Sequence, residues 1–356
     1  MGTFYQLKVI NVKTETQDSV VISFDIPNHL YDTFNYKSGQ YLTLKFDLEG
    51  KEVIRSYSLC SSPVPQKPLC IGVKRVEEGL VSNHINDTIK VGSVVEVKPP
   101  EGHFYADVRR GNYKTYYLFT AGSGITPILS ILRSVLLEEE KSYVYMIYGN
   151  RNHDSIMFKT ELSQLQEQFG NRLVIKHCLS KPKSSFWSNK QQTPYIKGRI
   201  DKKIVKWFLD EYPSYAQNTE YYICGPESMI NDTELALLSF DVPEGRIFKE
   251  SFGSINTGSI SVETVANAKL TATLHNENVE ISIEEGKTVL RALIDNNYNP
   301  PYSCEGGICA SCICKLKKGK VHMVNTISLT DEQIEQNYIL SCQSIPLTDE
   351  IVVEYN

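Results

Sequence analysis

Four cysteines near the C-terminus restrict the fold of this chain more than any other feature. Cys304, Cys309 and Cys312 stand on one short stretch, SCEGGICASCIC, separated by four and then by two residues, and Cys342 follows after a long gap. The glycine pair inside the stretch allows backbone amides to turn toward the sulfur atoms. The stretch is therefore a candidate for disulfides, for a zinc site or for a cluster that carries electrons.

Composition argues against disulfides. The chain has 356 residues and nine cysteines, an odd number that does not suit a stable disulfide framework. The opening MGTFYQLKVINVKTETQ contains no signal-peptide core, and the most apolar helical stretch, ITPILSILRSVLL, is interrupted by Arg133. We therefore expect a cytoplasmic protein that is not bound to a membrane, in which clustered cysteines bind metal or take part in catalysis.

The cysteine spacing favours an iron–sulfur cluster over zinc. A structural zinc site more often has two matched cysteine pairs, whereas C-x4-C-x2-C with a distant fourth cysteine gives each iron of a [2Fe-2S] cluster two sulfur ligands. This motif, and the cysteine of YILSCQS, resemble the plant-type ferredoxin family. The resemblance implies that Cys304, Cys309, Cys312 and Cys342 are the metal ligands. Cys314 lies outside the motif, and we expect it to be a buried strand residue.

Two periodicities divide the rest of the chain. Up to about Val97, short runs of alternating hydrophobicity are separated by turn residues, which predicts an antiparallel β-barrel. From about Thr115, strand-like and helical runs alternate, which predicts a parallel sheet covered on both faces. The small, polar, aperiodic SINTGSISVETVANA is typical of a linker. We predict a multidomain chain with an antiparallel β-barrel at 1–110, an α/β parallel-sheet domain at 111–252, a linker at 253–266 and an α+β ferredoxin-like β-grasp domain at 267–356.

Strand–helix alternation and, at some positions, capping residues predict the helices. In the α/β segment we expect helices from Pro127 and around 162–169, 202–209 and 228–239. In the last domain, TVLRALIDNN has Thr288 as a plausible N-cap, and LTDEQIEQN offers a capping box from Thr330 to Gln333.

The run RSYSLCSSP in the barrel segment suits a flavin. Tyr57 can stack on the ring, Ser58 can hydrogen-bond near N5, and Arg55 can hold a phosphate. Tyrosine and serine in a strand are also common on a half-buried surface. RSYS resembles the R-x-Y-S/T motif of the ferredoxin-NADP reductase superfamily, and the resemblance implies flavin binding by Arg55, Ser56, Tyr57 and Ser58.

Two further stretches of the barrel segment resemble the same superfamily. VKRVEEGLVSNHIND is similar to its G-x-x-S segment, at the start of a short helix whose amides would face the flavin phosphates. PPEGHF is similar to the turn that closes the barrel, with Phe104 directed inward. The resemblance implies FAD over FMN, because relatives that use FMN lack the second phosphate site. The cofactor-binding residues implied here are Lys74, Gly79, Val81 and Ser82.

The loop TAGSGITP follows a predicted strand and opens a predicted helix. We expect Thr126 as its N-cap and Pro127 at the first helical position. Gly122 and Gly124 would let a pyrophosphate approach the backbone and the positive end of the helix. The loop lacks the third glycine of the dinucleotide fingerprint, but it matches the nicotinamide-binding loop of the same superfamily, which implies that these four residues bind the cofactor.

Two motifs near the end of this segment complete the implied site. In YYICGPESM the resemblance places Cys224 beside the nicotinamide, with Gly225 and Pro226 shaping the turn; on its own, Cys224 would be expected to be a buried strand-end residue. In KESFG it places Glu250 near the reactive edge of the flavin and Phe252 near the ring. The implied catalytic residues are Ser58, Cys224 and Glu250.

The choice between NADPH and NADH depends on three polar residues. Arg151 in YGNRN, with Ser180 and Lys181 in LSKP, could hold a 2′-phosphate, which favours NADPH. Solvated surface charges are the alternative interpretation.

The order of the three segments suggests an electron-transfer chain. The whole sequence resembles the reductase components of bacterial multicomponent oxygenases, among them those of the phenylacetyl-CoA epoxidase and ketosteroid hydroxylase types. The resemblance implies electron flow from NAD(P)H through FAD and a [2Fe-2S] cluster to a terminal oxygenase. The alternatives are a stand-alone reductase of quinones, flavins or metal complexes, and a non-catalytic module that holds zinc.

The charge distribution bears on the partner. Residues 267–356 contain twelve acidic and seven basic residues and so carry the whole formal net charge of −5. Nothing resembles the basic stripe of a nucleic-acid binder. The acidity either steers a partner with a basic face, which would make electron transfer sensitive to salt, or only keeps the module soluble.

Overall fold

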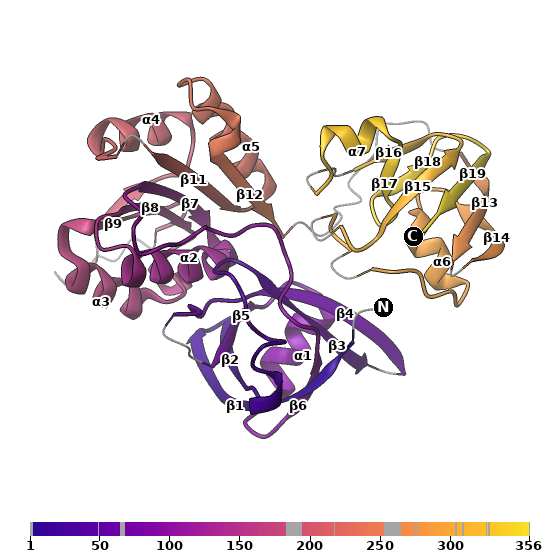
Figure 1. The fold of residues 1–356 in the computed structure, drawn as a ribbon, viewed down its shortest axis with the longest axis horizontal. Helices are drawn as coiled ribbons and strands as arrows, with labels where there is room; N and C mark the ends of the chain where they lie inside the picture. The colour runs from indigo at the N-terminus through magenta and orange to yellow at the C-terminus, as the bar shows by residue number, and fades with distance from the viewer. Residues whose placement is uncertain are drawn as a thin grey trace. The chain divides into compact units, whose positions relative to one another are not determined.

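The protein is described by a computed structural model. The residues described are 3–48, 50–64, 68–182, 194–216, 218–252, 265–274, 276–302, 305–307, 310–324, 326 and 328–355. The chain forms two compact units, Gly2–Ser251 and Phe252–Asn356, whose ribbons are shown in Figure 1. No helix among the described residues is both long and apolar enough to span a membrane.

The first part of the first unit is a six-stranded antiparallel sheet in the order β4-β3-β6-β1-β2-β5. An antiparallel bridge between Leu59, directly after β4, and Ile71 in β5 joins the two edges and closes the barrel. In β1, buried Leu7 and Val9 alternate with exposed neighbours, as the sequence pattern predicts. The elements are β1 (Tyr5–Thr16), β2 (Ser19–Asp25), β3 (Tyr41–Leu48), β4 (Lys51–Ser58), β5 (Leu69–Lys74), α1 (Leu80–Thr88) and β6 (Val94–Val97).

The second part of this unit is a six-stranded parallel sheet in the order β10-β9-β8-β7-β11-β12. Side chains of α2 and α3 pack on one face of the sheet, and those of α4 and α5 pack on the other. This confirms the predicted α/β architecture. The elements are β7 (Thr115–Ala121), α2 (Ile125–Glu138), β8 (Tyr143–Asn150), α3 (Lys159–Phe169), β9 (Leu173–Leu179), β10 (Tyr195–Lys197), α4 (Lys202–Glu211), β11 (Thr219–Gly225), α5 (Glu227–Leu238) and β12 (Ile247–Ser251).

Helix α2 does not start as predicted. It begins at Ile125 with Gly124 as N-cap, so Thr126 is inside the first turn and is not the cap. The reason is that β7 ends at Ala121 and a short 3-10 turn at Gly122–Gly124 leads directly into the helix. The Thr126 hydroxyl instead donates a hydrogen bond of 3.0 Å to the Ser123 carbonyl. Pro127 therefore occupies the third helical position, where its missing N–H still breaks no intrahelical bond.

The barrel and the parallel sheet share one hydrophobic core. Val21, Cys60, Phe104 and Ala106 of the barrel region pack in the same buried cluster as α2 and the α2-facing side of the sheet. A helix apolar on nearly every side, as α2 is, must be covered on nearly every side. Phe104 is buried as predicted, and its ring meets that of Tyr222 in β11 edge-on at 5.6 Å between centroids.

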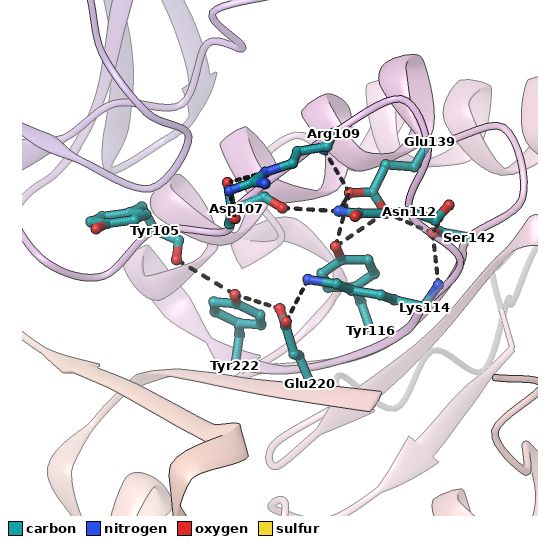
Figure 2. A network of polar contacts seen from close by, with 10 residues as sticks. All are labelled: Tyr105, Asp107, Arg109, Asn112, Lys114, Tyr116, Glu139, Ser142, Glu220 and Tyr222. Carbon is teal, nitrogen blue, oxygen red and sulfur yellow. Dashed lines mark hydrogen bonds and ion pairs between the residues drawn. The ribbon is translucent and has the colours of Figure 1, made fainter. Parts of the chain in front are cut away.

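Residues 98–114, which we call the connector, lead from β6 to β7 and are held by a polar network (Figure 2). Glu139, directly after α2, is fully buried. Its carboxylate accepts hydrogen bonds from Asn112 Nδ2 at 2.6 Å, Ser142 Oγ at 2.6 Å, the Tyr116 hydroxyl at 3.0 Å and the Arg109 amide at 3.2 Å. A buried carboxylate with this many donors has its hydrogen-bonding capacity satisfied.

A second group of contacts ties the connector to β11 (Figure 2). Lys114 Nζ pairs with Glu220 Oε1 at 2.6 Å, and the Tyr222 hydroxyl donates to Glu220 Oε2 at 2.9 Å. Tyr222 also reaches the Tyr105 carbonyl at 3.5 Å and stacks on Phe248 of β12 at 4.7 Å between centroids. The connector is thus fixed to both α2 and the parallel sheet.

The second unit contains a five-stranded mixed sheet in the order β14-β13-β19-β15-β17 and a two-stranded sheet of β16 and β18. Strands β13 and β19 are parallel neighbours, and α6 packs its buried face on this sheet. Thr288 caps α6 through the Arg291 amide, and the capping box from Thr330 to Gln333 is formed, as predicted. The elements are β13 (Asn267–Leu274), β14 (Glu277–Glu284), α6 (Val289–Asp295), β15 (Ile313–Lys318), β16 (Val321–Met323), α7 (Asp331–Glu335), β17 (Tyr338–Leu340), β18 (Ser344–Pro346) and β19 (Glu350–Glu354).

Two sequence predictions about this region have different outcomes. Cys314 is buried in β15 within the sheet core, as expected for a cysteine that is not a ligand. Most of the predicted linker, 253–264, lies outside the described residues. The exact domain boundaries remain predictions.

Candidate functional site

Two of the predicted catalytic residues meet where the barrel faces the parallel sheet. Ser58 ends β4, Glu250 lies in β12, and the Ser58 hydroxyl donates to Glu250 Oε2 at 3.4 Å. Only 4% of Glu250 is exposed. Burial raises the pKa of Glu250 from 4.5 to about 8, although the hydrogen bond from Ser58 lowers it. The carboxyl group is therefore mainly protonated at neutral pH.

Cys224 lies beside Glu250 on the neighbouring strand. The two residues are register partners between β11 and β12, so their side chains point to the same face of the sheet. Cys224 is fully buried, and this burial, followed by the nearby Glu250, raises the pKa of its thiol. A thiol that stays protonated can contact a ring by packing but does not act as a nucleophile.

The turns after β7 and β11 approach each other too closely for side chains. A Cβ on Gly124 would lie 2.3 Å from the Cys224 carbonyl oxygen, and one on Gly225 would lie 3.1 Å from the Ala121 amide nitrogen. Gly122 has a φ of 57°, which a glycine adopts without strain. The structure thus brings the predicted nicotinamide loop and the Cys224–Pro226 turn together.

Thr120 was not assigned a role from the sequence, although it belongs to the same loop. It is the register partner of Cys224, so Thr120, Cys224 and Glu250 form one row across β7, β11 and β12. Its Oγ1 is buried and has no hydrogen-bond partner within the described part of the chain. An unsatisfied buried hydroxyl beside a glycine-lined turn is what a site for a polar ligand would contain.

The RSYS motif is divided between the two faces of β4, because side chains alternate along a strand. Ser56 and Ser58 share one face, and Arg55 and Tyr57 share the other. Tyr57 is half-buried against the barrel core, and burial raises the pKa of its phenol. The Arg55 guanidinium donates to the Ile54 carbonyl at 2.7 Å. Flavin contacts by these residues remain predictions.

Helix α1 begins where the G-x-x-S motif predicts. Gly79 is its N-cap, with no side-chain capping hydrogen bond and no acidic residue in the first turn. The Ser82 hydroxyl shapes the preceding turn by accepting from the Val76 amide at 3.1 Å, and Val81 is buried. Lys74, at the end of β5, pairs with Asp18 at 3.5 Å. An uncapped helix start of this kind fits a phosphate group.

The residues predicted to hold a 2′-phosphate lie on neighbouring strand ends. The Lys181 amide donates to the Arg151 carbonyl at 2.8 Å, and the Ser180 amide donates to the Asn150 carbonyl at 3.0 Å. Arg151 and Lys181 are exposed. Phe252 is 40% exposed, and its place near the flavin stays a prediction.

Two of the four predicted metal ligands are described, and they are adjacent. The Cys312 and Cys342 sulfur atoms lie 3.2 Å apart, and both side chains are buried. Cys304 and Cys309 lie outside the described residues. Around them, Glu305, Gly307 and Ala310 have φ values of 54°, 74° and 53°. Left-handed backbone at residues other than glycine is uncommon and often marks functional loops.

Gln343 supports this cysteine loop and was not singled out from the sequence. Its side-chain amide donates to the Glu305 carbonyl at 3.0 Å, and its nitrogen lies 3.5 Å from Cys342 Sγ. Gln343 is buried. Its position directly after the fourth cysteine of the motif was the available signal.

Replacing Gln343 with leucine is expected to lower the midpoint potential of the predicted iron–sulfur centre. An N–H donor beside a ligand sulfur stabilises the more negative, reduced state. A net hydrogen-bond contribution of about 1 kcal/mol corresponds to about 40 mV for a one-electron couple. A redox titration followed by absorbance measures this shift in midpoint potential. Gln336→Leu, which removes an exposed glutamine bonded to Glu332, is the control, and equal shifts in both variants would contradict the role of Gln343.

Taken together, the fold and the residue clusters define an oxidoreductase with flavin, nicotinamide and iron–sulfur domains. Three family models match successive parts of the chain. They are the Oxidoreductase FAD-binding domain at 6–105, the Oxidoreductase NAD-binding domain at 118–234 and the 2Fe-2S iron-sulfur cluster binding domain at 272–347. The cofactor classes predicted from the sequence are thereby confirmed.

Curated relatives extend over the whole chain. It is 34% identical to a component of the 1,2-phenylacetyl-CoA epoxidase of Escherichia coli K12, with 100% of this chain and 99% of the relative covered. It is also 34% identical to the 3-ketosteroid-9-alpha-monooxygenase ferredoxin reductase component of Rhodococcus rhodochrous, with 98% and 96% covered. Phthalate dioxygenase reductase has the same fold, with a TM-score of 0.66 at 24% identity and 99% and 98% covered. The chain belongs to this family of three-domain FAD and [2Fe-2S] reductases.

Proposed function

We propose that the protein is the reductase component of a multicomponent oxygenase of the phenylacetyl-CoA epoxidase type. It would take electrons from NAD(P)H and pass them through FAD and a [2Fe-2S] cluster to a terminal oxygenase. The observation that carries the proposal is the contact of Ser58 in the flavin barrel with Glu250 in the nicotinamide domain, in a chain that continues into an iron–sulfur domain. The names of the full-length relatives support the choice of an oxygenase as acceptor.

The cofactors explain why three domains are needed. When bound, a flavin takes up two electrons as hydride and releases them singly, and a [2Fe-2S] cluster carries one electron at a time. The protein's contribution is to position the groups and to set the local charge. We assign cofactor contacts to the sequence-predicted residues on this basis.

The residues around Glu250 would keep the reacting region neutral and dry. Protonated Glu250 and the Cys224 thiol add no negative charge where hydride arrives. The Ser58 hydroxyl is oriented by its hydrogen bond to Glu250, and it can pass a proton between that carboxyl group and a ligand at the edge of the barrel. Gly124 and Gly225 let the turns after β7 and β11 lie against each other beside the row of Thr120, Cys224 and Glu250.

An anaerobic ultraviolet–visible titration tests this proposal. Adding NADPH or NADH to the purified holoenzyme is expected to bleach both flavin and iron–sulfur absorption, and a purified oxygenase should then be reduced. If both absorptions are bleached and the protein then rapidly reduces quinones or ferricyanide but does not reduce the oxygenase, a stand-alone reductase would be favoured. Flavin absorption without iron–sulfur absorption, together with bound zinc, would contradict electron transfer through the cysteine cluster.

Arg151→Ala and Lys181→Ala are expected to raise the KM for NADPH and to leave the KM for NADH unchanged. Each exposed cation is proposed to contact the 2′-phosphate that only NADPH carries. A charge-assisted contact of this kind contributes about 1.5 kcal/mol, or about tenfold in KM. Steady-state kinetics with both nucleotides measures the effect, and NADH is the internal control. Equal changes for both nucleotides would support the alternative of solvated surface charges.

A further inference from the structure

The single charged residue that interrupts the apolar stretch ITPILSILRSVLL is directed at the barrel. Arg133, in α2, has 20% of its side chain exposed. Its Nη1 donates to the Cys60 carbonyl, two residues after Ser58. Its Nε donates to Glu161 Oε1 in α3 at 2.7 Å, and its Nη2 binds the same oxygen. The guanidinium is therefore fixed by a carboxylate on one side and reaches the barrel backbone on the other.

Two serines on the same side of α2 bind the following residues of the barrel. Ser130 Oγ donates to the Ser61 carbonyl at 2.5 Å, and Ser134 Oγ lies 2.9 Å from Ser62 Oγ. Positions 130, 133 and 134 lie on one helix face because their spacing is three and four residues. All four serines are buried. One face of α2 thus holds the consecutive residues Cys60, Ser61 and Ser62 that follow the catalytic strand β4.

The same helix is anchored to the other half of the site at its start. Gly124, the N-cap of α2, lies against the Cys224 carbonyl, where a Cβ would come within 2.3 Å. Cys224 is the register partner of Glu250. Since an α-helix is stiff over this length, α2 relates the strand that carries Ser58 to the strands that carry Cys224 and Glu250.

We infer that Arg133 is a positioning residue for hydride transfer, which holds the end of β4 through the Cys60 carbonyl and so keeps Ser58 in contact with Glu250. This inference rests on the proposed function. Ser130 and Ser134 supply single hydrogen bonds to the same segment, whereas Arg133 in α2 joins the segment that follows β4 to α3 at one point. A displacement of about 1 Å at a reacting site can cost about 100-fold in rate.

The first test compares Arg133→Met with Arg172→Met. Arg172 is a matched control, because it also donates to main-chain carbonyls, those of Ser142 at 3.0 Å and of Glu139, but does so away from β4. The limiting rate of flavin reduction at saturating nicotinamide, measured by anaerobic stopped flow, should fall about 100-fold in Arg133→Met. FAD content and nucleotide Kd should be unchanged, and Arg172→Met should keep the wild-type rate. Equal losses in both variants would overturn the inference.

A double-mutant cycle distinguishes positioning of Ser58 by Arg133 from a general loss of rigidity in the protein. If Arg133 acts through Ser58, Arg133→Met should reduce the rate little further in a Ser58→Ala background. If the rate losses of the two single variants multiply in the double variant, Arg133 and Ser58 act independently, and the inference is overturned. Should Arg133→Met fail to fold, Glu161→Gln frees the guanidinium without removing it, and its limiting rate should fall while that of Arg172→Met does not. An unchanged rate in Glu161→Gln would contradict the inference.

Hydrogen exchange gives a readout that does not depend on turnover. The Cys60 amide donates to the Cys70 carbonyl at 2.8 Å, so its exchange reports whether the end of β4 stays in place. Exchange of this amide should accelerate in Arg133→Met and stay slow in Arg172→Met. Unchanged exchange would overturn the inference. Wild-type protein that fails to reduce flavin with nicotinamide would instead contradict the proposed function, whatever the exchange result.

Discussion

Cys312→Ser is expected to abolish electron transfer to a one-electron protein acceptor and to leave reduction of the flavin by nicotinamide intact. Cys312 is buried 3.2 Å from Cys342 in the second compact unit. The Ser58, Cys224 and Glu250 cluster belongs to the first unit, which has hydrophobic cores of its own. Losing a predicted cluster ligand should therefore interrupt only the last part of the proposed electron path. Stopped-flow flavin reduction and reduction of an oxygenase or cytochrome c measure the two parts separately.

Cys314→Ser is the matched control for this experiment. Cys314 is equally buried, stands two residues further along, and packs in the sheet core, whereas Cys312 and Cys342 pack in a separate cluster. It should retain iron–sulfur absorption and electron transfer, although stability can decrease because a hydroxyl replaces a thiol in an apolar environment. Loss of flavin reduction in Cys312→Ser would mean that the two units fold together. Loss of the cluster in both variants would contradict the ligand assignment.

The rate of flavin reduction is expected to fall about tenfold per pH unit above pH 8. Burial raises the pKa of Glu250 to about 8, and above that value the protonated fraction falls tenfold per unit. An ionised carboxylate beside the reacting edge opposes the negative charge that arrives with hydride. Glu250→Gln keeps a neutral side chain, so it should remove this decline. Limiting rates measured from pH 6 to 10 provide the comparison.

The same titration has a consequence for stability. The pKa of Glu250 rises from 4.5 to about 8 in the folded protein, so folding takes up a proton between these pH values. The free energy of unfolding should fall by about 1.4 kcal/mol per pH unit across this window because of Glu250. Glu250→Gln should remove this slope. The control is Glu234→Gln, because Glu234 lies in α5 and forms an ion pair with Lys249 of β12; it should preserve both the stability slope and the rate profile. A rate decline that persists in Glu250→Gln would contradict the assignment.

Local patterns in the sequence predicted the architecture well, because they reflect local physics. Alternation of period two gave the barrel strands, and strand–helix alternation gave the parallel sheet. The N-cap of α2 was predicted wrongly because capping depends on where the preceding strand ends. The 3-10 turn at Gly122–Gly124 leads directly into the helix, so the helix begins earlier than expected. Capping boxes that rely only on nearby side chains, such as that of Thr330, were predicted correctly.

Local sequence patterns could not predict the contacts between residues that are far apart in the sequence. Resemblance to a superfamily indicated Ser58 and Glu250 separately, but only the fold brings residues separated by 192 positions within hydrogen-bond distance. Arg133 was visible only as an interruption of an apolar run, and Gln343 only as the neighbour of a cysteine. Their partners, the Cys60 carbonyl and the cysteine loop, come from other parts of the chain.

The connector has a consequence for exchanging parts between relatives. The predicted boundary at residue 110 falls inside the network around Glu139, which binds Arg109 on one side and Asn112 on the other. A chimera joined there would combine Glu139 with donors from another chain, and a buried polar group left without its hydrogen bonds costs about 1–3 kcal/mol. An exchange of parts that respects this packing must therefore carry the barrel, the connector, α2 and the parallel sheet together.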